Sequence, residues 1–148
     1  MDGRNFYLYQ MSVKGFIVKS ADGIIRFRYD QEAPVTSAAF DERLPFSKEL
    51  IHARVAGQEI WTDDAPLLDI IQENASVFAE PGEVVIGPLK PSRVKTSGCL
   101  GIYYGVGKGL DSCNIFAKAY EEDMPKLKAL GEQIWKAGIQ KISFERLT

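Results

Sequence analysis

The chain has 148 residues, of which 45% are hydrophobic and 26% are charged, and its 18 basic and 20 acidic side chains nearly balance. These proportions are typical of one globular domain, and they exclude a strongly basic surface for nucleic acid. No apolar segment is long enough to cross a bilayer, and no secretory leader is recognisable. We therefore expect a cytoplasmic protein that binds neither a membrane nor a nucleic acid.

The first predicted element is a β-hairpin over residues 11–29 with a two-residue turn at Asp22 and Gly23. That turn would place Val18 opposite Phe27 on an apolar face. The opposite face carries the basic residues Lys19, Arg26 and Arg28. One apolar face and one polar face are typical of an antiparallel pair that covers a core.

Residues 1–10 precede this hairpin and are interpreted as an N-terminal extension. No repeat, linker or low-complexity segment divides the rest of the chain. We therefore predict a single domain over residues 11–148.

Two helices are predicted. The first spans residues 34–44, with Thr36 or Ser37 as its N-terminal cap. The second begins near Glu121, where acidic residues suit the positive end of a helix, and ends at Gly138. Its apolar stripe consists of Leu127, Leu130 and Ile134.

Six further strands follow the first hairpin in the predicted order. They are expected at residues 50–55, 58–62, 84–87, 100–104, 114–120 and 141–147. The total of eight strands is enough to close a small barrel whose interior is filled by side chains, with the two helices over its ends. Residues 65–82 predict a long connection, either a short helix or an irregular loop.

The segment LIHARVAGQEIW, residues 50–61, contains the only histidine of the chain. A turn at Ala56 and Gly57 would pair His52 with Trp61 and Arg54 with Glu59. The side chains expected to face the core are then Ile51, Ala53 and Ile60. The side chains expected on the other face are His52, Arg54, Glu59 and Trp61. Only an odd-length loop or a bulge would change this pairing.

Two interpretations of that second face are open. As the wall of a ligand site, it offers Arg54 to clamp a carboxylate or carbonyl, and His52 or Glu59 to move a proton. Trp61 adds a flat surface for a planar ligand. As a solvated sheet face, it holds only one Arg–Glu pair, which stabilises by less than about 1 kcal/mol.

Three other residues are candidate ligand contacts. Tyr103 and Cys99 share one face of the glycine-rich strand GCLGIYYG, where they offer a hydroxyl and a thiol. Arg93 lies in the basic loop GPLKPSRVKTSG and could attract an anion. The alternative is that Tyr103 and Cys99 only pack in the core and that the loop is solvated.

The sequence predicts neither a metal nor a cofactor. Two cysteines, Cys99 and Cys113, are too few for a disulfide framework and lack the spacing of metal ligands. One histidine makes a zinc site improbable. The glycine-rich strand lacks the Lys-Ser/Thr ending of a phosphate loop.

The order of the elements resembles the cyclophilin fold, a closed eight-stranded β-barrel capped by two helices. The chain is more specifically similar to a bacterial family of cyclophilin-like proteins of unassigned function, the domain of unknown function 3830. The matching stretches are LPFSKELIHARVAGQEIW, PGEVVIGP, GCLGIYYG and CNIFAKA, within residues 13–147. The resemblance implies a mainly β fold, but a fold does not define a function.

Three functions are therefore considered. The first is a protein that binds or processes a small planar carboxylate or cyclic amide, with amide or imide hydrolysis or tautomerisation as its chemistry if it is an enzyme. The second is a peptidyl-prolyl isomerase with Arg54 as its catalytic residue, although IHARV matches the cyclophilin Phe-His-Arg stretch only in part and no Phe-Met-Gln-Gly-Gly run follows. The third is a non-catalytic interaction module that forms a homo-oligomer through exposed strand faces and the N-terminal extension.

Overall fold

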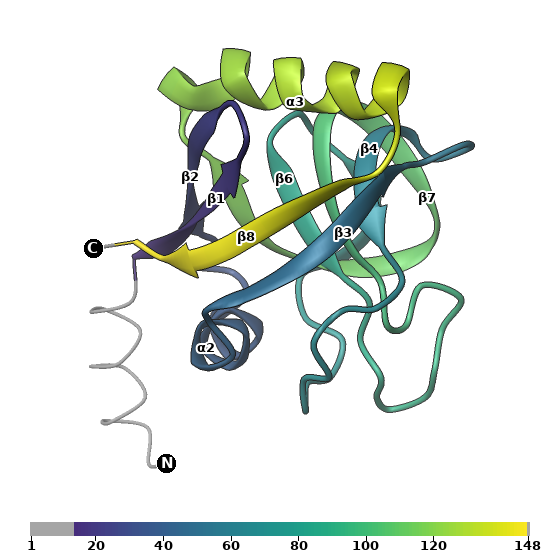
Figure 1. The fold of residues 1–148 in the computed structure, drawn as a ribbon. Helices are drawn as coiled ribbons and strands as arrows, with labels where there is room; N and C mark the ends of the chain where they lie inside the picture. The colour runs from purple at the N-terminus through teal and green to yellow at the C-terminus, as the bar shows by residue number, and fades with distance from the viewer. Residues whose placement is uncertain (1–13, 148) are drawn as a thin grey trace.

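The computed structural model describes residues 14–147, which form one antiparallel β-sheet with a helix at either end (Figure 1). The elements within these residues are β1 (Gly15–Ser20), β2 (Gly23–Tyr29), α2 (Pro34–Glu42), β3 (Phe46–His52), β4 (Gly57–Thr62), β5 (Ala75–Ala79), β6 (Glu83–Ile86), β7 (Leu100–Ala119), the 3-10 turn η1 (Glu121–Asp123), α3 (Met124–Ala137) and β8 (Gln140–Arg146). The protein is thus mainly β, as predicted. The predicted N-terminal extension lies outside the described residues.

The sheet closes on itself. The strands pair in the order β2-β1-β8-β3-β4-β7, and β2 also pairs with β7, which completes a ring of six strands. β6 lies between two arms of β7, because Ile86 is opposite both Leu100 and Asn114. α3 covers one end of the ring and α2 lies at the other (Figure 1).

The described residues contain eight strands, as predicted, but two of the eight differ from the prediction. Residues 100–104 and 114–120 were expected as separate strands and are instead the two arms of the 20-residue β7. Residues 75–79, expected within a helix or loop, form β5, which pairs with the middle of β7. β7 can bend through this middle part because Gly107 has no side chain, and a Cβ there would overlap the Tyr103 ring.

The interior of the ring is an aromatic core centred on Phe16. The Phe16 ring centroid lies 5.0 Å from that of Phe27 and 4.9 Å from that of Phe40. The five core phenylalanines, all with no exposed surface, are Phe16, Phe27, Phe40, Phe116 and Phe144. Burial of one such ring stabilises the fold by roughly 1.5–3 kcal/mol. The predicted stripe of α3 is confirmed, since Leu127, Leu130 and Ile134 are buried against this core.

The register predicted for the first hairpin is wrong by two residues. Val18 is opposite Ile25, and the turn consists of Ala21 and Asp22. The Asp22 amide donates to the Ser20 hydroxyl at 3.2 Å, and this hydrogen bond stabilises the observed turn at Ala21 and Asp22. A shift of two residues keeps every side chain on its predicted face, so the hydrophobic pattern could not distinguish the two registers.

The N-terminal cap predicted for the first helix is also wrong. α2 follows Ala33, with Pro34 in its first turn, and both Thr36 and Ser37 are buried inside the helix. The carboxylate of Glu73, from a distant segment, accepts hydrogen bonds from the Thr36 amide and hydroxyl at 2.8 and 2.7 Å. A tertiary contact therefore replaces the local cap, and local sequence could not reveal it.

Strand boundaries were predicted with mixed accuracy. The strands expected at residues 58–62, 84–87 and 141–147 are found within one residue at each end. The strand expected at residues 50–55 begins and ends earlier, because Phe46 already pairs with Phe144 of β8. None of the helices described within residues 14–147 is both long and apolar enough to span a membrane.

Candidate functional site

The hairpin of β3 and β4 differs by one residue from the predicted pairing. Ile51 is opposite Trp61, and His52 is opposite Ile60. The Ala53 amide donates to the Glu59 carbonyl at 2.9 Å, so the connection between these two residues has an odd number of residues. A shift of one residue moves one strand's side chains to the opposite face relative to the other strand. The predicted grouping of His52 with Trp61 is therefore wrong.

The shift also corrects the predicted core. Ile60 has no exposed surface and Ala53 is 7% exposed, as expected for core residues. Ile51, predicted to face the core, is 41% exposed on the outside of the sheet. Its place on the inner side is taken by His52, which is half-buried beside the end of α3.

The outer face of β4 and β7 brings together most of the other predicted site residues. Glu59 is opposite Tyr103, and Trp61 is opposite Gly101. We call Glu59, Gly101, Tyr103, Cys99 and Cys113 the Glu59 cluster. A small buried apolar group that includes Val85 and Ile115 lies beside it.

The Glu59 carboxyl has an unusual electrostatic environment. Burial raises its pKa from an ordinary 4.5 to about 7, and a hydrogen bond with the Tyr103 hydroxyl only partly opposes this rise. Within residues 14–147 no basic side chain forms an ion pair with Glu59. The residue is still half-buried rather than enclosed. Glu59 is therefore an accessible carboxyl that titrates near neutral pH.

Gly101 leaves the space that the Glu59 carboxyl occupies. A Cβ built on Gly101 would overlap Glu59 Oε2. A glycine inside a strand often marks a close approach, but the sequence alone does not identify Gly101 as the neighbour of Glu59. Its role follows only from the β4–β7 register.

The two thiols of the cluster are poor nucleophiles. Burial raises the pKa of the Cys113 thiol to about 12. Burial also raises the pKa of the Cys99 thiol, and the negative charge of Glu59 adds to the rise. Both thiols are therefore protonated near neutral pH. No group of three or more metal-ligating side chains occurs among the residues that the structure describes.

His52 belongs to a different contact network. Its Nδ1 lies 2.7 Å from the Ala53 carbonyl and its Nε2 lies 2.7 Å from the Tyr104 hydroxyl. A carbonyl can only accept, so Nδ1 carries a proton, and in the neutral ring Nε2 accepts from Tyr104. The His52 ring also packs edge-on against Trp135 of α3, with centroids 4.7 Å apart. His52 thus links β3, β7 and α3 and does not join the Glu59 cluster.

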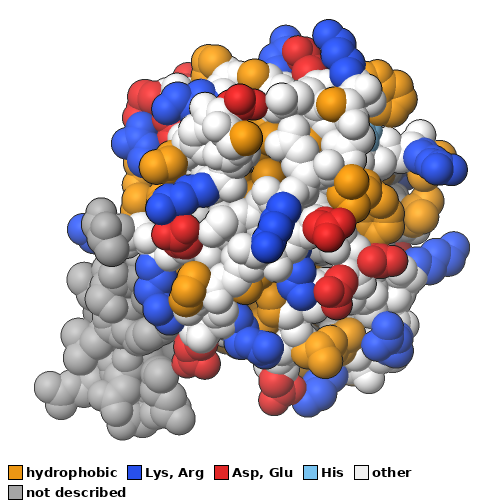
Figure 2. All heavy atoms as spheres, in the orientation of Figure 1, with side chains coloured by type: hydrophobic (Ala, Val, Ile, Leu, Met, Phe, Trp, Pro, Cys, Tyr) orange, Lys and Arg blue, Asp and Glu red, His pale blue; other side chains and the backbone are white. Residues whose placement is uncertain are grey.

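The two predicted arginines lie outside the cluster. Arg54 is exposed in the connection between β3 and β4, and Arg93 is exposed in the loop before β7. The face in Figure 2 shows basic and acidic side chains intermixed rather than one large basic patch. The structure therefore provides no cation beside Glu59 within the described residues to hold a carboxylate ligand there.

A family model described as "Protein of unknown function (DUF3830)" matches residues 18–146. Two solved structures are similar in fold. The structure of McbB in complex with tryptophan has a TM-score of 0.68 and 16% identity, and the match covers 88% of this chain but 44% of that one. The chain thus spans less than half of McbB. The solution structure of the hypothetical protein AF2241 from Archaeoglobus fulgidus has a TM-score of 0.61 and 15% identity, with 91% and 96% covered. No curated protein matches the chain.

Proposed function

Because the chain belongs to the DUF3830 family, whose function is unknown, we propose a function from its own geometry: it binds a small cyclic amide or imide at the Glu59 cluster and moves a proton on it. The proposed framework is a cyclophilin-like barrel. If the two arms of β7 are counted as separate strands, with β6 paired between them, the closed ring contains eight strands.

The observation that carries the proposal is the Glu59 carboxyl, with a pKa of about 7 and no basic partner within residues 14–147. A carboxyl that is about half protonated at neutral pH can donate one hydrogen bond and accept another. A cyclic amide or imide presents a carbonyl and an N–H on one edge, which is the complementary pattern. Trp61, two residues along β4 on the same face, offers a flat surface for such a ring.

The electrostatics favour the amide over the planar carboxylate. A ligand carboxylate beside Glu59 would bring a second negative charge into a poorly solvated place, which raises the free energy of both groups. Arg54, the cation expected to offset that charge, is exposed outside the cluster. The proposed ligand is therefore neutral.

The proposed chemistry is proton transfer by Glu59. In its acid form the carboxyl donates to the carbonyl oxygen of the ligand, and in its ionised form it accepts the proton of the ring nitrogen. Together the two transfers interconvert the amide and its hydroxy-imine tautomer, with no net gain or loss of protons. An acid–base group is most effective when its pKa lies near the working pH, as that of Glu59 does.

The isomerase alternative lacks a supporting observation. Its predicted catalytic residue, Arg54, is exposed in the connection that follows β3 rather than on the strand face. The interaction-module alternative relied partly on the N-terminal extension, which lies outside the described residues.

A thermal-shift screen tests the proposal. Hydantoin, succinimide and 2-pyrrolidinone are compared with succinate and benzoate on the wild type, Glu59→Gln and the matched control Glu32→Gln, which changes an exposed glutamate. A ligand at about 100 times its Kd should stabilise by about 2.7 kcal/mol, or roughly 5–11 °C for a chain of this size. We expect the amides and imides to raise the Tm of the wild type and of Glu32→Gln by a similar amount. The rise should be smaller for Glu59→Gln. No shift with any amide, or equal shifts in both variants, would refute the proposal.

A further inference from the structure

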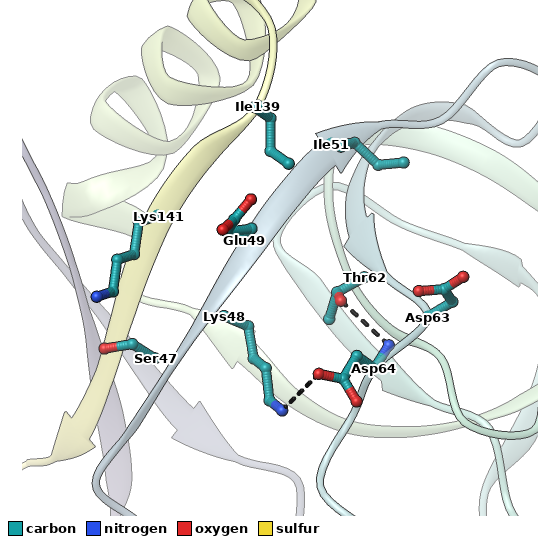
Figure 3. A pocket seen from close by; sticks show the side chains of 9 residues that line it. All are labelled: Ser47, Lys48, Glu49, Ile51, Thr62, Asp63, Asp64, Ile139 and Lys141. Atoms are coloured by element: carbon teal, nitrogen blue, oxygen red, sulfur yellow. Dashed lines mark hydrogen bonds and ion pairs between the residues drawn. The ribbon is translucent and has the colours of Figure 1, made fainter.

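A groove of about 490 Å³ lies between β3 and the end of β4, along the edge of β4 that faces away from β7 (Figure 3). Its lining residues are Ser47, Lys48, Glu49, Ile51, Thr62, Asp63, Asp64, Ile139 and Lys141. None of them belongs to the Glu59 cluster. The volume falls within the usual range for ligand sites, about 300–1,000 Å³.

The groove exists because β4 diverges from β3 before β3 reaches its N-terminal end. Pairing between the two strands stops at Ile51 and Trp61, whereas the other edge of β3 stays paired with β8 as far as Phe46. Beyond Thr62 the chain turns away. The Asp64 amide donates to the Thr62 hydroxyl at 3.1 Å, and the Ala65 amide donates to the Gly98 carbonyl at 3.0 Å.

Among residues 14–147, this separation leaves part of the β3 edge without a partner strand. In an antiparallel pair every second residue directs its N–H and C=O toward the same neighbour. Since Ala53 donates to Glu59 across the hairpin, Ile51, Glu49 and Ser47 direct their main-chain groups to that side as well. Ile51 is paired with Trp61, but Glu49 and Ser47 have no residue opposite them on β4. Their main-chain donors and acceptors therefore face the groove.

We propose that this edge binds an extended peptide segment with a basic side chain, which adds as a strand beside β3. Main-chain hydrogen bonds to Ser47 and Glu49 would hold the peptide, as in other cases of strand addition. The residue that pairs with Glu49 would lie between Glu49 and Asp63, on the open side of the groove.

The charges of the groove favour a basic side chain at that place. The lining carries three carboxylates and two ammonium groups. Lys48 is already paired with Asp64 at 3.1 Å, across the gap between the strands (Figure 3). Within residues 14–147 neither Glu49 nor Asp63 forms an ion pair. An opposite charge directly across an added strand is stabilising, and a like charge is not.

The probe is the peptide Val-Lys-Val-Lys-Val, acetylated and amidated at its ends, which spans roughly 17 Å when extended. It is titrated into the ¹⁵N-labelled full chain, and the amide signals are followed by NMR. The first control peptide carries N-methyl groups on both lysine amides, which removes the donors that would face β3. The second has glutamate in place of lysine. The protein variants are Asp63→Asn and its matched control Asp22→Asn, an exposed carboxylate in the β1–β2 turn.

We expect saturable shifts at Ser47, Glu49 and Asp63, with affinity at least about 10-fold weaker for the N-methylated peptide. Asp63→Asn should weaken binding by about 2- to 5-fold, as expected for loss of one exposed charge pair, and Asp22→Asn should not. Glu59→Gln should bind the peptide like the wild type, so this result is independent of the proposed amide site. No saturable binding at millimolar peptide, shifts confined to other residues, or equal affinity for the N-methylated or glutamate peptide would overturn the inference.

Discussion

Replacing Glu59 by glutamine should stabilise the protein at about pH 8 and change its stability little below about pH 4.5. The pKa of Glu59 is about 7 in the folded chain, against an ordinary 4.5. Each unit of difference corresponds to about 1.4 kcal/mol, so the carboxyl destabilises the ionised folded state by about 3 kcal/mol. Glutamine keeps the shape and the hydrogen bonding of the protonated acid and cannot ionise.

The direction follows from proton linkage. Burial raises the pKa of Glu59 above its value in the unfolded chain. As the pH rises above about 4.5, the unfolded chain releases this proton first, which lowers the free energy of unfolding. The loss is complete above about pH 7, where the folded chain has released the proton too. The stability difference between the variant and the wild type should therefore grow across this window and then stay constant.

Melting temperatures at about pH 4.5, 5.5, 6.5 and 8 measure this difference. For a chain of this length 1 kcal/mol shifts Tm by about 2–4 °C, so the gap at pH 8 should reach roughly 6–12 °C. Glu32→Gln, an exposed replacement of the same type, provides the baseline. A Tm difference that does not vary with pH, or a Glu59→Gln variant that melts below the wild type at pH 8, would refute a raised pKa of Glu59 in the folded chain.

Three further replacements give distinct outcomes. Gly101→Ala should fold, because the atoms nearest to its new Cβ belong to the Glu59 side chain and not to the backbone, but it should displace that carboxyl and abolish both the amide-dependent thermal shift and the pH-dependent Tm gap. Tyr104→Phe should remove the hydroxyl bonded to His52 and cost about 1 kcal/mol in a denaturant titration, with amide binding unchanged. Phe16→Ala should cost about 3–5 kcal/mol in the same titration, because it leaves a cavity at the centre of the aromatic core.

Much of the fold could be predicted because burial follows the period of each element. The α3 stripe of Leu127, Leu130 and Ile134 was predicted from spacing alone, and all three residues are buried. The two arms of β7 do not alternate in burial, because residues 100–105 and 113–117 are buried without interruption. What the spacing could not show is that the arms are continuous, since a glycine-rich bend and a turn have the same composition.

The site was harder to predict because it depends on register, and register depends on loop length. The two-residue error in the first hairpin left its faces intact, whereas the one-residue error at β3 and β4 separated His52 from Trp61. Glu59 and Trp61 stay together because they lie on one strand, two residues apart. Tyr103 joins Glu59 through pairing between β4 and β7, 44 positions apart along the chain. Pairs within one strand could therefore be predicted, and pairs across an uncertain turn could not.

The departure of β4 from β3 also makes the two proposed sites energetically separable. Glu59 lies at the start of the regular pairing of β4 with β7, and its carboxyl is mostly buried, so its charge affects folding stability. Asp63 lies just past the end of β4, exposed to water, where a single charge contributes little to folding. Glu59→Gln should therefore change the pH dependence of Tm and amide binding without affecting the peptide. Asp63→Asn should do the reverse, and a variant that altered both would indicate that the groove and the cluster share one ligand.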